Sequence, residues 1–306
     1  MRILVTGADG QLGQDLLSAL AGQVPTGGRR CSLRAPEGAQ PDPGHEVLAT
    51  DIANMRVDDR DAVQATFRVF DPELVLHGGA LTAVDLCESE VDLAYAVNAI
   101  GTRNVAEAAA AVGAHLVYVS TDYVFDGTLT RPYREWDHPN PHSVYGASKL
   151  AGEQECPPDA TIVRTSWVSG AHGANMVKTA LRLAAGDGEL AFVDDQHGSP
   201  TFTADLAAAL VTLGTERRPG TFHITNSGAT TWWAFVRAVL AEVGADPERV
   251  RAISTADLVP PRPAPRPANS VLDNLALRLS GFAPLPPWQD GLSRLVAALT
   301  AQGDHP

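Results

Sequence analysis

The sequence contains few of the features that indicate disulfides, structural metals or membrane spans. Its three cysteines, Cys31, Cys87 and Cys156, lie far apart and form no Cys-x-x-Cys pair, which disfavours a disulfide framework and a structural zinc site. The apolar run near the N-terminus is too short for the core of a signal peptide, and no apolar stretch approaches the ~18 residues of a transmembrane helix. We therefore expect a soluble, globular, cytoplasmic protein.

Positive charge is also scarce. The 306 residues include 23 Lys and Arg against 36 Asp and Glu, so the net charge is −13 at neutral pH. A chain this acidic lacks the basic surface of a nucleic-acid-binding protein and is repelled by anionic membranes, so we expect neither partner. Apolar residues make up 44% of the chain, which is enough for a sizeable core and excludes wholesale disorder.

Short β-branched runs alternate with helical patterns over the first two thirds of the chain. Continuous apolar strands separated by helices are typical of a parallel sheet that is covered on both faces. The predicted fold class is therefore α/β, with a doubly wound parallel (Rossmann) sheet. Strands are expected at 2–6, 46–50, 74–77, 115–121 and 160–165, and helices at 11–20, 61–70, 90–112 and from about 143.

A glycine-rich loop follows the first expected strand directly. Gly7, Gly10 and Gly13 in the string TGADGQLG have the spacing of a turn that opens a helix. Without Cβ atoms, such a loop lets backbone N–H groups and the helix N-terminus approach a pyrophosphate. An ordinary strand–turn–helix with incidental glycines is the alternative, but the position after the first strand favours a dinucleotide site.

The chain is expected to divide into two parts. We predict an NAD(P)-binding Rossmann domain at 1–165, to which the chain returns at about 187–225. Residues 166–186 and 226–306 are predicted to form a smaller C-terminal substrate-binding lobe, with helices at 232–243, 272–280 and 288–301. The Pro- and Gly-rich stretch 21–45 interrupts the strand–helix pattern and is expected to be a long loop.

Tyr145 and Lys149 give the sharpest chemical signal. Because they are four residues apart on an expected helix, they share one face, and we expect the lysine ammonium to lie beside the tyrosine phenol. A neighbouring cation lowers the pKa of a phenol from ~10 toward the range in which it is an efficient general acid. With five tyrosines and two lysines in the chain, chance alone would place a lysine four residues after a tyrosine about 0.03 times. A chance pairing is therefore disfavoured.

A second polar string, Ser120-Thr121-Asp122-Tyr123, follows the strand expected at 115–121. The carboxyl ends of strands are where ligands bind in a doubly wound sheet. A hydroxyl at that edge can donate to a carbonyl oxygen that gains charge during hydride addition. An ST-turn that merely ends the strand is the alternative, and it becomes the less favoured interpretation beside Tyr145 and Lys149.

Other residue pairs have simpler interpretations, and we predict no metal site. Pro139 and Pro141 preclude a helix that would converge His138 and His142, which favours a turn. Adjacent acidic residues are more often solvated or capping groups than metal ligands, and adjacent tryptophans in the second lobe are most simply core residues. These pairs are Asp58-Asp59, Asp194-Asp195 and Trp232-Trp233.

The glycine loop, the strand-end STD and the Tyr-x-x-x-Lys pair together resemble the extended short-chain dehydrogenases/reductases, which act on nucleotide sugars. Within this group, the chain is similar to the dTDP-4-dehydrorhamnose reductase family over nearly its whole length. The similar strings are LTAVDLCESE, STDYVFDG, PYREWDHPNPHSVYGASKLAGE, RTSWV, DDQHGSPT and RPANSVLD. The resemblance implies NAD(P)H-dependent reduction of the C4 ketone of dTDP-4-dehydro-L-rhamnose to dTDP-L-rhamnose, the last step of a route to cell-wall or O-antigen polysaccharides.

The resemblance also implies roles for individual residues. The catalytic group would be Thr121, Tyr145 and Lys149. Residues that would hold the cofactor are Gly7, Gly10, Gln11, Leu12, Gly13, Asp51, Asp58, Gly79, Ala80, Tyr145 and Lys149. Residues that would contact the dTDP-sugar are Val84, Asp85, Asp122, Tyr123 and Trp167 at the sugar and Arg266 at the diphosphate, since a guanidinium suits paired phosphate oxygens.

Three departures from the family pattern leave questions open. His77-Gly78-Gly79-Ala80 stands where the family usually has Asn-Ala-Ala-Ala, so packing near the nicotinamide is expected to differ. The loop at 21–45 is longer than usual in the family and is expected close to the adenosine end. Its Arg29, Arg30 or Arg34 would attract a 2′-phosphate that Asp51 opposes, which leaves NADH and NADPH as alternatives. Some family members bind Mg²⁺ at a dimer interface, and Asp15 and Glu189 match two of the ligands. The C-terminal stretch 291–302 has no carboxylate to match the third, so Mg²⁺ is doubtful and the chain is expected to be a monomer or a homodimer.

Other activities remain as alternatives. One is reduction of another dTDP-4-keto-6-deoxysugar, and another is a nucleotide-sugar epimerase or dehydratase, which would retain oxidised NAD. A non-catalytic, NADP-binding regulatory subunit belongs to a different class. Such a subunit need not keep a proton donor, so the intact Thr121, Tyr145 and Lys149 argue against it.

Overall fold

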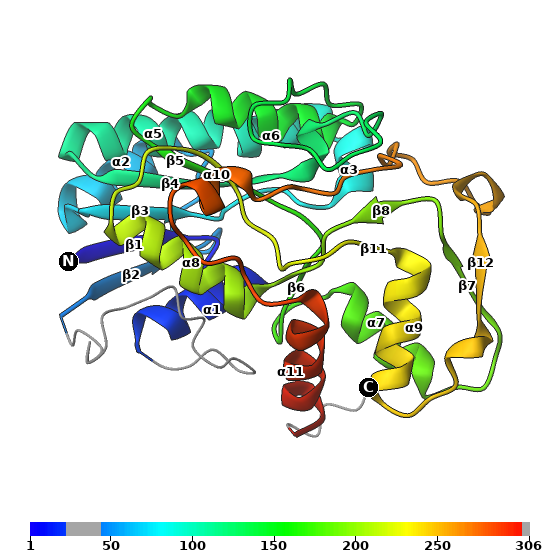
Figure 1. Ribbon diagram of the computed structural model, residues 1–306. Coiled ribbons are helices and arrows are strands. Elements are labelled where there is room, and N and C mark those ends of the chain that lie inside the picture. The colour runs from blue at the N-terminus through cyan, green and yellow to red at the C-terminus, as the bar shows by residue number, and fades with distance from the viewer. Residues whose placement is uncertain (23–43, 302–306) are drawn as a thin grey trace.

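The computed structural model describes residues 1–22 and 44–301, and its centre is a six-stranded parallel sheet (Figure 1). The strand order is β10-β5-β4-β3-β1-β2, and every neighbouring pair is parallel. The doubly wound parallel sheet predicted from the sequence is confirmed. The strands are β1 (Arg2–Thr6), β2 (Glu46–Thr50), β3 (Leu74–His77), β4 (His115–Thr121), β5 (Thr161–Thr165) and β10 (Gly220–His223).

The strand order reverses direction between β1 and β3. From β1 the chain moves outward to β2, crosses back to β3 on the other side of β1, and then continues outward through β4 and β5. The loops that leave β1 and β3 therefore diverge and open a crevice at the carboxyl ends of the strands, which is where ligands bind in such sheets. Gly7 and Gly79 lie on these two loops.

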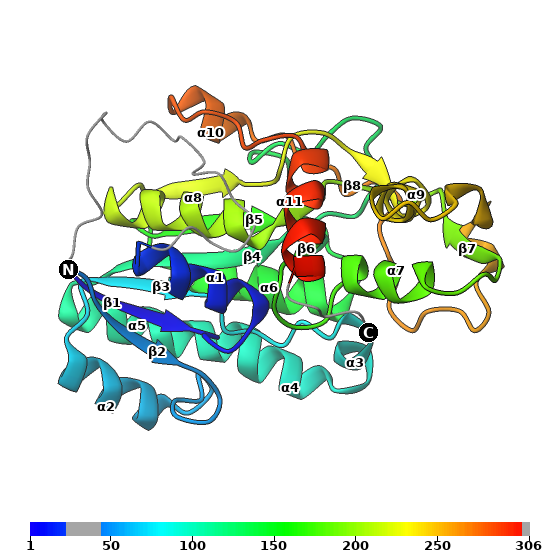
Figure 2. The ribbon, with the colours of Figure 1, turned by 90° about the horizontal axis from the view of Figure 1, so that it is seen from below.

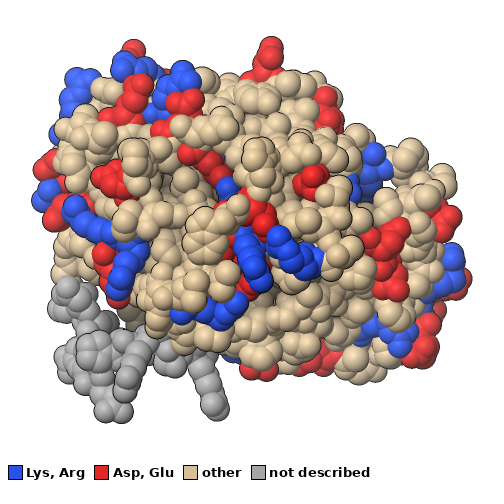
Figure 3. Space-filling view, turned by 45° about the horizontal axis from the view of Figure 1, so that its top comes forward, with Lys and Arg blue, Asp and Glu red and all other residues tan. Residues whose placement is uncertain are grey.

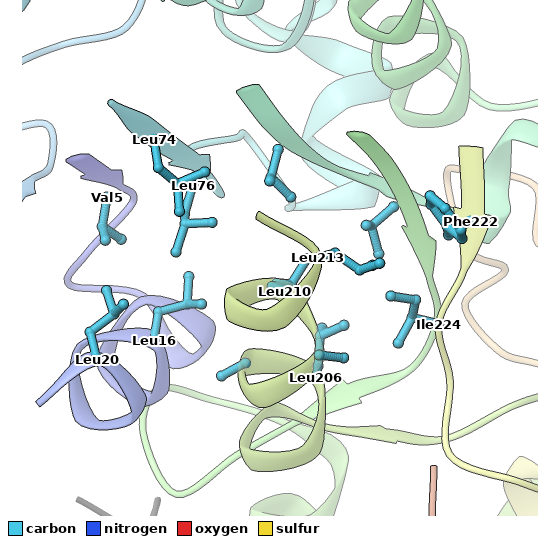
Figure 4. Close-up of a cluster of buried hydrophobic side chains, with 14 of the residues drawn as sticks. Val5, Leu16, Leu20, Leu74, Leu76, Leu206, Leu210, Leu213, Phe222 and Ile224 are labelled. Atoms are coloured by element: carbon cyan, nitrogen blue, oxygen red, sulfur yellow. The ribbon is translucent and has the colours of Figure 1, made fainter. Parts of the chain in front are cut away.

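Helices cover both faces of the sheet, with α2, α5 and α6 on one face and α1 and α8 on the other (Figure 1). Leu16 of α1 and Leu210 of α8 point toward the strands and pack against Val5 and Leu76 (Figure 4). The strands are buried on both faces, which is why they are continuous apolar runs. The helices are α1 (Gln11–Leu20), α2 (Arg60–Phe70), α5 (Gly101–Val112), α6 (Val144–Glu155) and α8 (Thr203–Thr215).

The single helix expected at 90–112 is interrupted, so that prediction is wrong in detail. It consists of α4 (Val91–Tyr95), a π-helical turn (Ala96–Ile100) and α5, preceded by the short α3 (Val84–Ser89). Asn98 in the π-helical turn is fully buried, and its side-chain amide hydrogen-bonds with Leu81 and Ser148. Turns of this kind interrupt helices where a side chain must reach a specific partner, and they cluster near functional sites.

A second lobe packs beside the carboxyl ends of the strands (Figure 2). Its own core contains Phe235, Val239, Trp288 and Leu292. Its helices are α7 (Met176–Ala184), α9 (Trp232–Glu242) and α11 (Trp288–Ala301). Its strand pairs are β7 (Leu190–Val193) with β12 (Val250–Ile253), β8 (His197–Gly198) with β11 (Thr230–Thr231), and β6 (Val168–Ser169) with β9 (Thr201–Phe202).

The boundary between the two parts differs from expectation at two places. The chain returns to the large sheet through α8 and β10, which lie within the predicted return at about 187–225, but β7 at the start of that stretch pairs with β12 in the second lobe. The helix expected in the second lobe at 272–280 is shortened to α10 (Leu275–Leu279), because Leu272 bridges to Tyr133 in extended conformation. It packs on the large domain instead, since Ala276 and Leu277 belong to the core cluster of Val5 and Leu76.

The surface and the helices add two observations. On the face shown in Figure 3, acidic and basic side chains are interspersed, and no continuous basic surface is visible. Among residues 1–22 and 44–301, no helix is long and apolar enough to cross a membrane.

Candidate active site

A cleft of about 860 Å³ lies at the carboxyl ends of the strands and extends to the second lobe. All the residues predicted to hold a cofactor line this cleft: Gly7, Gly10, Gln11, Leu12, Gly13, Asp51, Asp58, Gly79, Ala80, Tyr145 and Lys149. Thr121 and four of the predicted substrate residues, Val84, Asp122, Tyr123 and Trp167, line it too. Asp85 and Arg266 do not. The structure therefore brings most of the predicted site together in a single cavity.

The glycine loop forms a cradle with no room for side chains. Gly7 has a φ of +70°, and a Cβ on it would lie 2.8 Å from the backbone nitrogen of Gly79. A Cβ on Gly13 would lie 2.2 Å from the carbonyl oxygen of Gly7. Gly10 is the N-cap of α1, where no side chain caps the helix and no acidic residue occupies the first turn. The free N–H groups of this helix end and the missing Cβ atoms fit a pyrophosphate.

Next to the glycine loop, the residues that follow β2 make the cleft acidic, and Arg56 adds a positive charge there. Asp51 directly follows β2, and its carboxylate accepts hydrogen bonds from the backbone N–H groups of Asp9 (2.9 Å) and Ile52 (2.7 Å). Asp58 forms an ion pair with Arg56 at 2.7 Å. Arg56 lines the cleft and was missed by sequence analysis, although its place on the loop after β2 is a usable signal. Arg29, Arg30 and Arg34 lie outside the described residues.

Helix α6 positions Tyr145 and Lys149. Ser143 caps its N-terminus by accepting a hydrogen bond from the N–H of Gly146 at 3.1 Å, which places Tyr145 in the first turn and Lys149 in the next. Lys149 is 3% exposed, and its Nζ donates to the carbonyl oxygen of Val119 at 2.7 Å and lies 4.1 Å from the centre of the Tyr118 ring. Burial lowers the pKa of Lys149 to about 7.

The expected effect of Lys149 on Tyr145 is not found. Burial raises the pKa of the Tyr145 phenol above its ordinary value, and the largest opposing influence is the Thr121 side chain. The prediction that the ammonium lowers this pKa is wrong in this structure, because Lys149 is directed to Val119 and Tyr118 instead. The consequence is a phenol that keeps its proton, together with a lysine that titrates close to neutral pH.

Thr121 ends β4 and makes the ST-turn that was considered as an alternative. Its hydroxyl donates to the Asp122 carboxylate at 3.0 Å and accepts from the N–H of Tyr123 at 3.2 Å. Asp122 is 3% exposed, and the side chains of Thr121 and Ser270 oppose the effect of burial on its carboxyl group. Burial raises the pKa of Asp122 to about 7. Thr121 therefore forms the turn and lines the cleft at the same time, together with Asp122 and Tyr123.

Aromatic side chains enclose the other end of the cleft. The rings of Tyr123 and Tyr145 meet edge to face, with 5.7 Å between centres. Trp167 has a φ of +48°, a left-handed conformation that a bulky residue rarely adopts. Its indole stacks on Trp232 at 3.6 Å and 7°, and a Cβ on Gly198 would lie 2.3 Å from it.

Trp232 packs against the core of the second lobe as predicted, but it has a second role that sequence analysis missed. The Trp232-Trp233 pair was assigned to the core of the second lobe, but Trp232 also lines the cleft. Trp233 instead packs within the lobe and donates to the carbonyl oxygen of Val250 at 2.8 Å. No sequence signal distinguishes the two, because the distinction depends on which one faces Trp167, 65 residues earlier in the chain.

Asp85 and Arg266 contact each other. Arg266 donates both terminal nitrogens to the Asp85 carboxylate, at 2.5 and 2.9 Å. The Arg266 guanidinium also lies close enough to the Tyr123 phenol to lower its pKa against the effect of burial, so the pair lies beside a residue that lines the cleft. The prediction that Asp85 lines the sugar pocket is therefore not met, because its carboxylate is held by the arginine.

The two acidic residues that match a metal site in the family have protein partners within this chain. Asp15 is buried on α1, accepts a hydrogen bond from the Thr203 hydroxyl and lies in a small cavity that is also lined by Arg294. Glu189 is exposed and pairs with Arg251 at 3.4 Å. Within the described part of the chain, no three His, Cys, Asp or Glu side chains cluster as metal ligands do.

Comparison with known proteins adds evidence independent of this geometry. A family model described as the RmlD substrate binding domain matches residues 1–301. A dTDP-4-dehydrorhamnose reductase from Streptomyces griseus is 42% identical over 100% of this chain and 96% of its own length. A probable dTDP-4,6-dihydroxy-2-methyloxan-3-one 4-ketoreductase from Streptomyces antibioticus is 37% identical over 100% of this chain and 98% of its own length.

Solved structures agree with these relatives. A dTDP-4-dehydrorhamnose reductase from Clostridium acetobutylicum superposes with a TM-score of 0.88 at 39% identity, over 98% of this chain and 100% of the other. A dTDP-4-dehydrorhamnose reductase from Bacillus anthracis, in complex with NADP, gives a TM-score of 0.85 at 37% identity, over 97% and 98% of the two chains. The whole chain, including the second lobe, takes part in both matches.

Proposed function

The chain belongs to the dTDP-4-dehydrorhamnose reductase family, and we propose that it reduces the C4 ketone of dTDP-4-dehydro-L-rhamnose to give dTDP-L-rhamnose. The observation that carries the proposal is the common cleft. A glycine cradle for a dinucleotide, the proton-bearing Tyr145 with Thr121 and Lys149, and an aromatic pocket formed with the second lobe all line one cavity.

A nicotinamide cofactor would supply the hydride. The N-terminus of α1 and the glycine loop would hold its pyrophosphate, and Asp51 would accept hydrogen bonds from the hydroxyls of the adenosine ribose. NADH and NADPH are both candidates. The Asp51 carboxylate favours the ribose diol of NADH, whereas Arg56, two residues before its partner Asp58, offers a cation to a 2′-phosphate.

Tyr145 would donate the proton to the C4 oxygen. Because burial raises the pKa of the phenol, Tyr145 is protonated at neutral pH, which is the form that a general acid needs. Lys149 would contact the cofactor ribose, and its ammonium becomes available when it leaves the Val119 carbonyl. Thr121 would fix the ketone by turning its hydroxyl from Asp122 to the substrate oxygen.

The substrate would lie between the sheet and the second lobe. Val84, Asp122, Tyr123 and Trp167 line the part of the cleft next to Tyr145, where the deoxysugar must sit for its C4 to be reached. Arg266, in contact with Tyr123, would meet the diphosphate. No step of this proposal uses a metal ion, and it holds for a monomer or a homodimer alike.

Loss of nicotinamide absorbance tests the proposal. The purified protein is mixed with NADH or NADPH and with dTDP-4-dehydro-L-rhamnose, made from dTDP-glucose by a dehydratase and an epimerase. Oxidation that requires enzyme, cofactor and sugar, with dTDP-L-rhamnose as the product, is expected. Cofactor binding without oxidation of this sugar would contradict the proposal.

A second candidate is reduction of another dTDP-4-keto-6-deoxysugar. It is favoured by the Streptomyces antibioticus relative, whose name specifies a different 4-ketoreductase substrate. The same assay with several dTDP-ketosugars separates the two, because the true substrate gives the highest kcat/KM.

A further inference from the structure

Two arginines on a segment that crosses between the two parts of the molecule meet one carboxylate of the large domain. The segment Pro260–Pro267 reads PPRPAPRP, so only Arg262, Ala264 and Arg266 carry a backbone N–H. The N–H of Ala264 donates to the Asp85 carboxylate at 3.1 Å, and Arg266 donates to it twice. Asp85 belongs to α3 of the large domain, so this contact joins regions about 180 residues apart in the chain.

The charges at this contact do not balance. The Arg262 guanidinium lies 3.8 Å from the same carboxylate that Arg266 holds, so two cations face one anion. Asp273 is likewise flanked by Arg134 and Arg278, so what distinguishes the Asp85 cluster is its position beside Tyr123, which lines the cleft. Two guanidinium groups that converge on one point match a dianion better than a single carboxylate.

The contact is also connected to the proposed proton donor. The Arg266 guanidinium lies beside the Tyr123 phenol, whose pKa it lowers, and the ring of Tyr123 packs edge to face on Tyr145 with 5.7 Å between ring centres. A group bound at Arg266 therefore lies two side chains from Tyr145. The diphosphate of a nucleotide sugar is a dianion, and it must lie beyond the sugar on the side away from the nicotinamide.

We propose that Asp85 occupies the position of the substrate diphosphate, and that the diphosphate displaces it from Arg266 and Arg262 when the nucleotide sugar binds. This inference rests on the proposed function, since it takes the substrate to be a nucleotide diphosphate sugar. The two oxygens of a carboxylate engage the guanidinium fork as two phosphate oxygens do, so one geometry serves both anions. The Asp85 side chain is 33% exposed, and water can hydrate it once it is released.

Asp85 acts in this scheme as an internal competitor that sets the affinity for the diphosphate. While no ligand is bound, Asp85 holds the two guanidinium groups close together. Only molecules in which the ion pair is open can bind the diphosphate, so the apparent affinity for the diphosphate falls in proportion to the fraction of open molecules. Nucleosides and sugars without the diphosphate do not gain from opening the pair. The contact would therefore select for the charged part of the substrate.

Calorimetric titration of the whole protein with dTDP and with thymidine tests this inference without requiring turnover. The variant Asp85→Asn keeps the side-chain shape and removes its charge. We expect it to bind dTDP about tenfold more tightly than the wild type, with thymidine binding unchanged. Asp92→Asn is the matched control, because Asp92 is exposed on the neighbouring α4 and makes the same change in net charge. It should leave both affinities unchanged.

A double-variant cycle separates competition from a general charge effect. In an Arg266→Gln background, Asp85→Asn should no longer strengthen dTDP binding, since its guanidinium partner is gone. Unchanged NADH binding and an unchanged midpoint of thermal unfolding show that each variant is folded.

Three results would overturn the inference. The first is equal or weaker dTDP binding by Asp85→Asn when the wild type binds dTDP, because Asp85 would then only orient Arg266. The second is a gain that persists without Arg266. The third is failure of the wild type to bind dTDP at all, which would remove the proposed substrate and this inference with it.

Discussion

The two ends of the cleft are built by different means. The cofactor end is made of backbone, with Gly7, Gly10 and Gly13 packed so closely that a Cβ on Gly13 would lie 2.2 Å from a carbonyl oxygen. The substrate end is made of side chains that hold one another, such as Trp167 on Trp232 and Asp85 on Arg266.

This difference indicates how each end responds to change. A backbone cradle binds a group that is the same in every reaction, and it fails when any atom is added to it. Side chains paired across two lobes can exchange partners when a substrate enters, so single substitutions there should alter affinity and leave the cradle intact. Tyr145 lies where the two ends meet.

The largest effect is expected at this meeting point. Tyr145→Phe removes the proton donor and should lower kcat by about 10³-fold, within the range of general acid catalysis, while the Kd of NADH stays nearly constant. Steady-state kinetics and a cofactor titration measure the two quantities. Tyr95→Phe, on the exposed side of α4, is the matched control and should retain full activity. Substantial activity in Tyr145→Phe would show that another group supplies the proton.

The second largest effect is expected at the cofactor end. Gly13→Ala should weaken NADH binding by about 100-fold, because the added methyl meets backbone atoms of the loop that cannot move independently. Gly188→Ala is the control, since no atom lies within 4 Å of its added methyl. Thermal unfolding of both variants verifies the fold. Unchanged cofactor affinity in a folded Gly13→Ala would show that the pyrophosphate is held elsewhere.

A smaller effect is expected at the substrate end. Trp232→Leu removes the stacking partner of Trp167, an interaction worth about 1 kcal/mol, and should raise the KM of the dTDP-sugar about fivefold. The Kd of NADH should not change, because the cradle is untouched. Trp136→Leu, at an exposed tryptophan, controls for loss of an indole. A larger change in NADH affinity than in KM would contradict the division of the cleft into two ends.

The smallest of these effects is expected when the pH is changed, and it concerns the affinity for the cofactor. Lys149 and Asp122 both have pKa values of about 7, the first lowered and the second raised by burial. As the pH rises through 7, the ammonium loses its charge and the carboxyl gains one, so the cleft becomes more negative. Affinity for the anionic cofactor should fall a few-fold over this range.

Lys149→Arg separates the two titrations. A guanidinium stays charged at every accessible pH, so this variant should retain only the part of the pH dependence that arises from Asp122. Fluorescence titration of NADH from pH 6 to pH 8 provides the measurement, in approximately half-unit steps. Affinity that rises with pH in the wild type would contradict the assigned directions of the two pKa shifts.

The glycine cradle and the placement of Tyr145 and Lys149 on one helix could be predicted because their signals are local. The Gly7-x-x-Gly10-x-x-Gly13 spacing, the strand ends and the i, i+4 relation of Tyr145 and Lys149 all lie within one strand–turn–helix unit or one helix. Such patterns follow from the periods of helices and strands, and the structure places these residues in one cleft, although the Lys149 ammonium points to Val119 and not to the Tyr145 phenol.

The contacts at the substrate end could not be predicted from such patterns. Trp167 with Trp232, and Asp85 with Arg266, join residues that only tertiary packing brings together. The prediction of where the Lys149 side chain points was wrong for a related reason. Helical spacing places it on the face of Tyr145, but the Val119 carbonyl of a neighbouring strand decides where the ammonium points. The π-helical turn also depends on a distant partner, since Asn98 reaches Ser148 on α6.

The most direct test of the account is the fate of a labelled hydride. The protein is given dTDP-4-dehydro-L-rhamnose and NADH or NADPH deuterated at the transferable position of the nicotinamide, and the product is examined by NMR. We predict one deuterium at C4 of dTDP-L-rhamnose and its loss, together with turnover, in Tyr145→Phe. A product without deuterium at C4, or one with the opposite configuration there, would contradict the assignment of this cleft as a C4 ketoreductase of the rhamnose series.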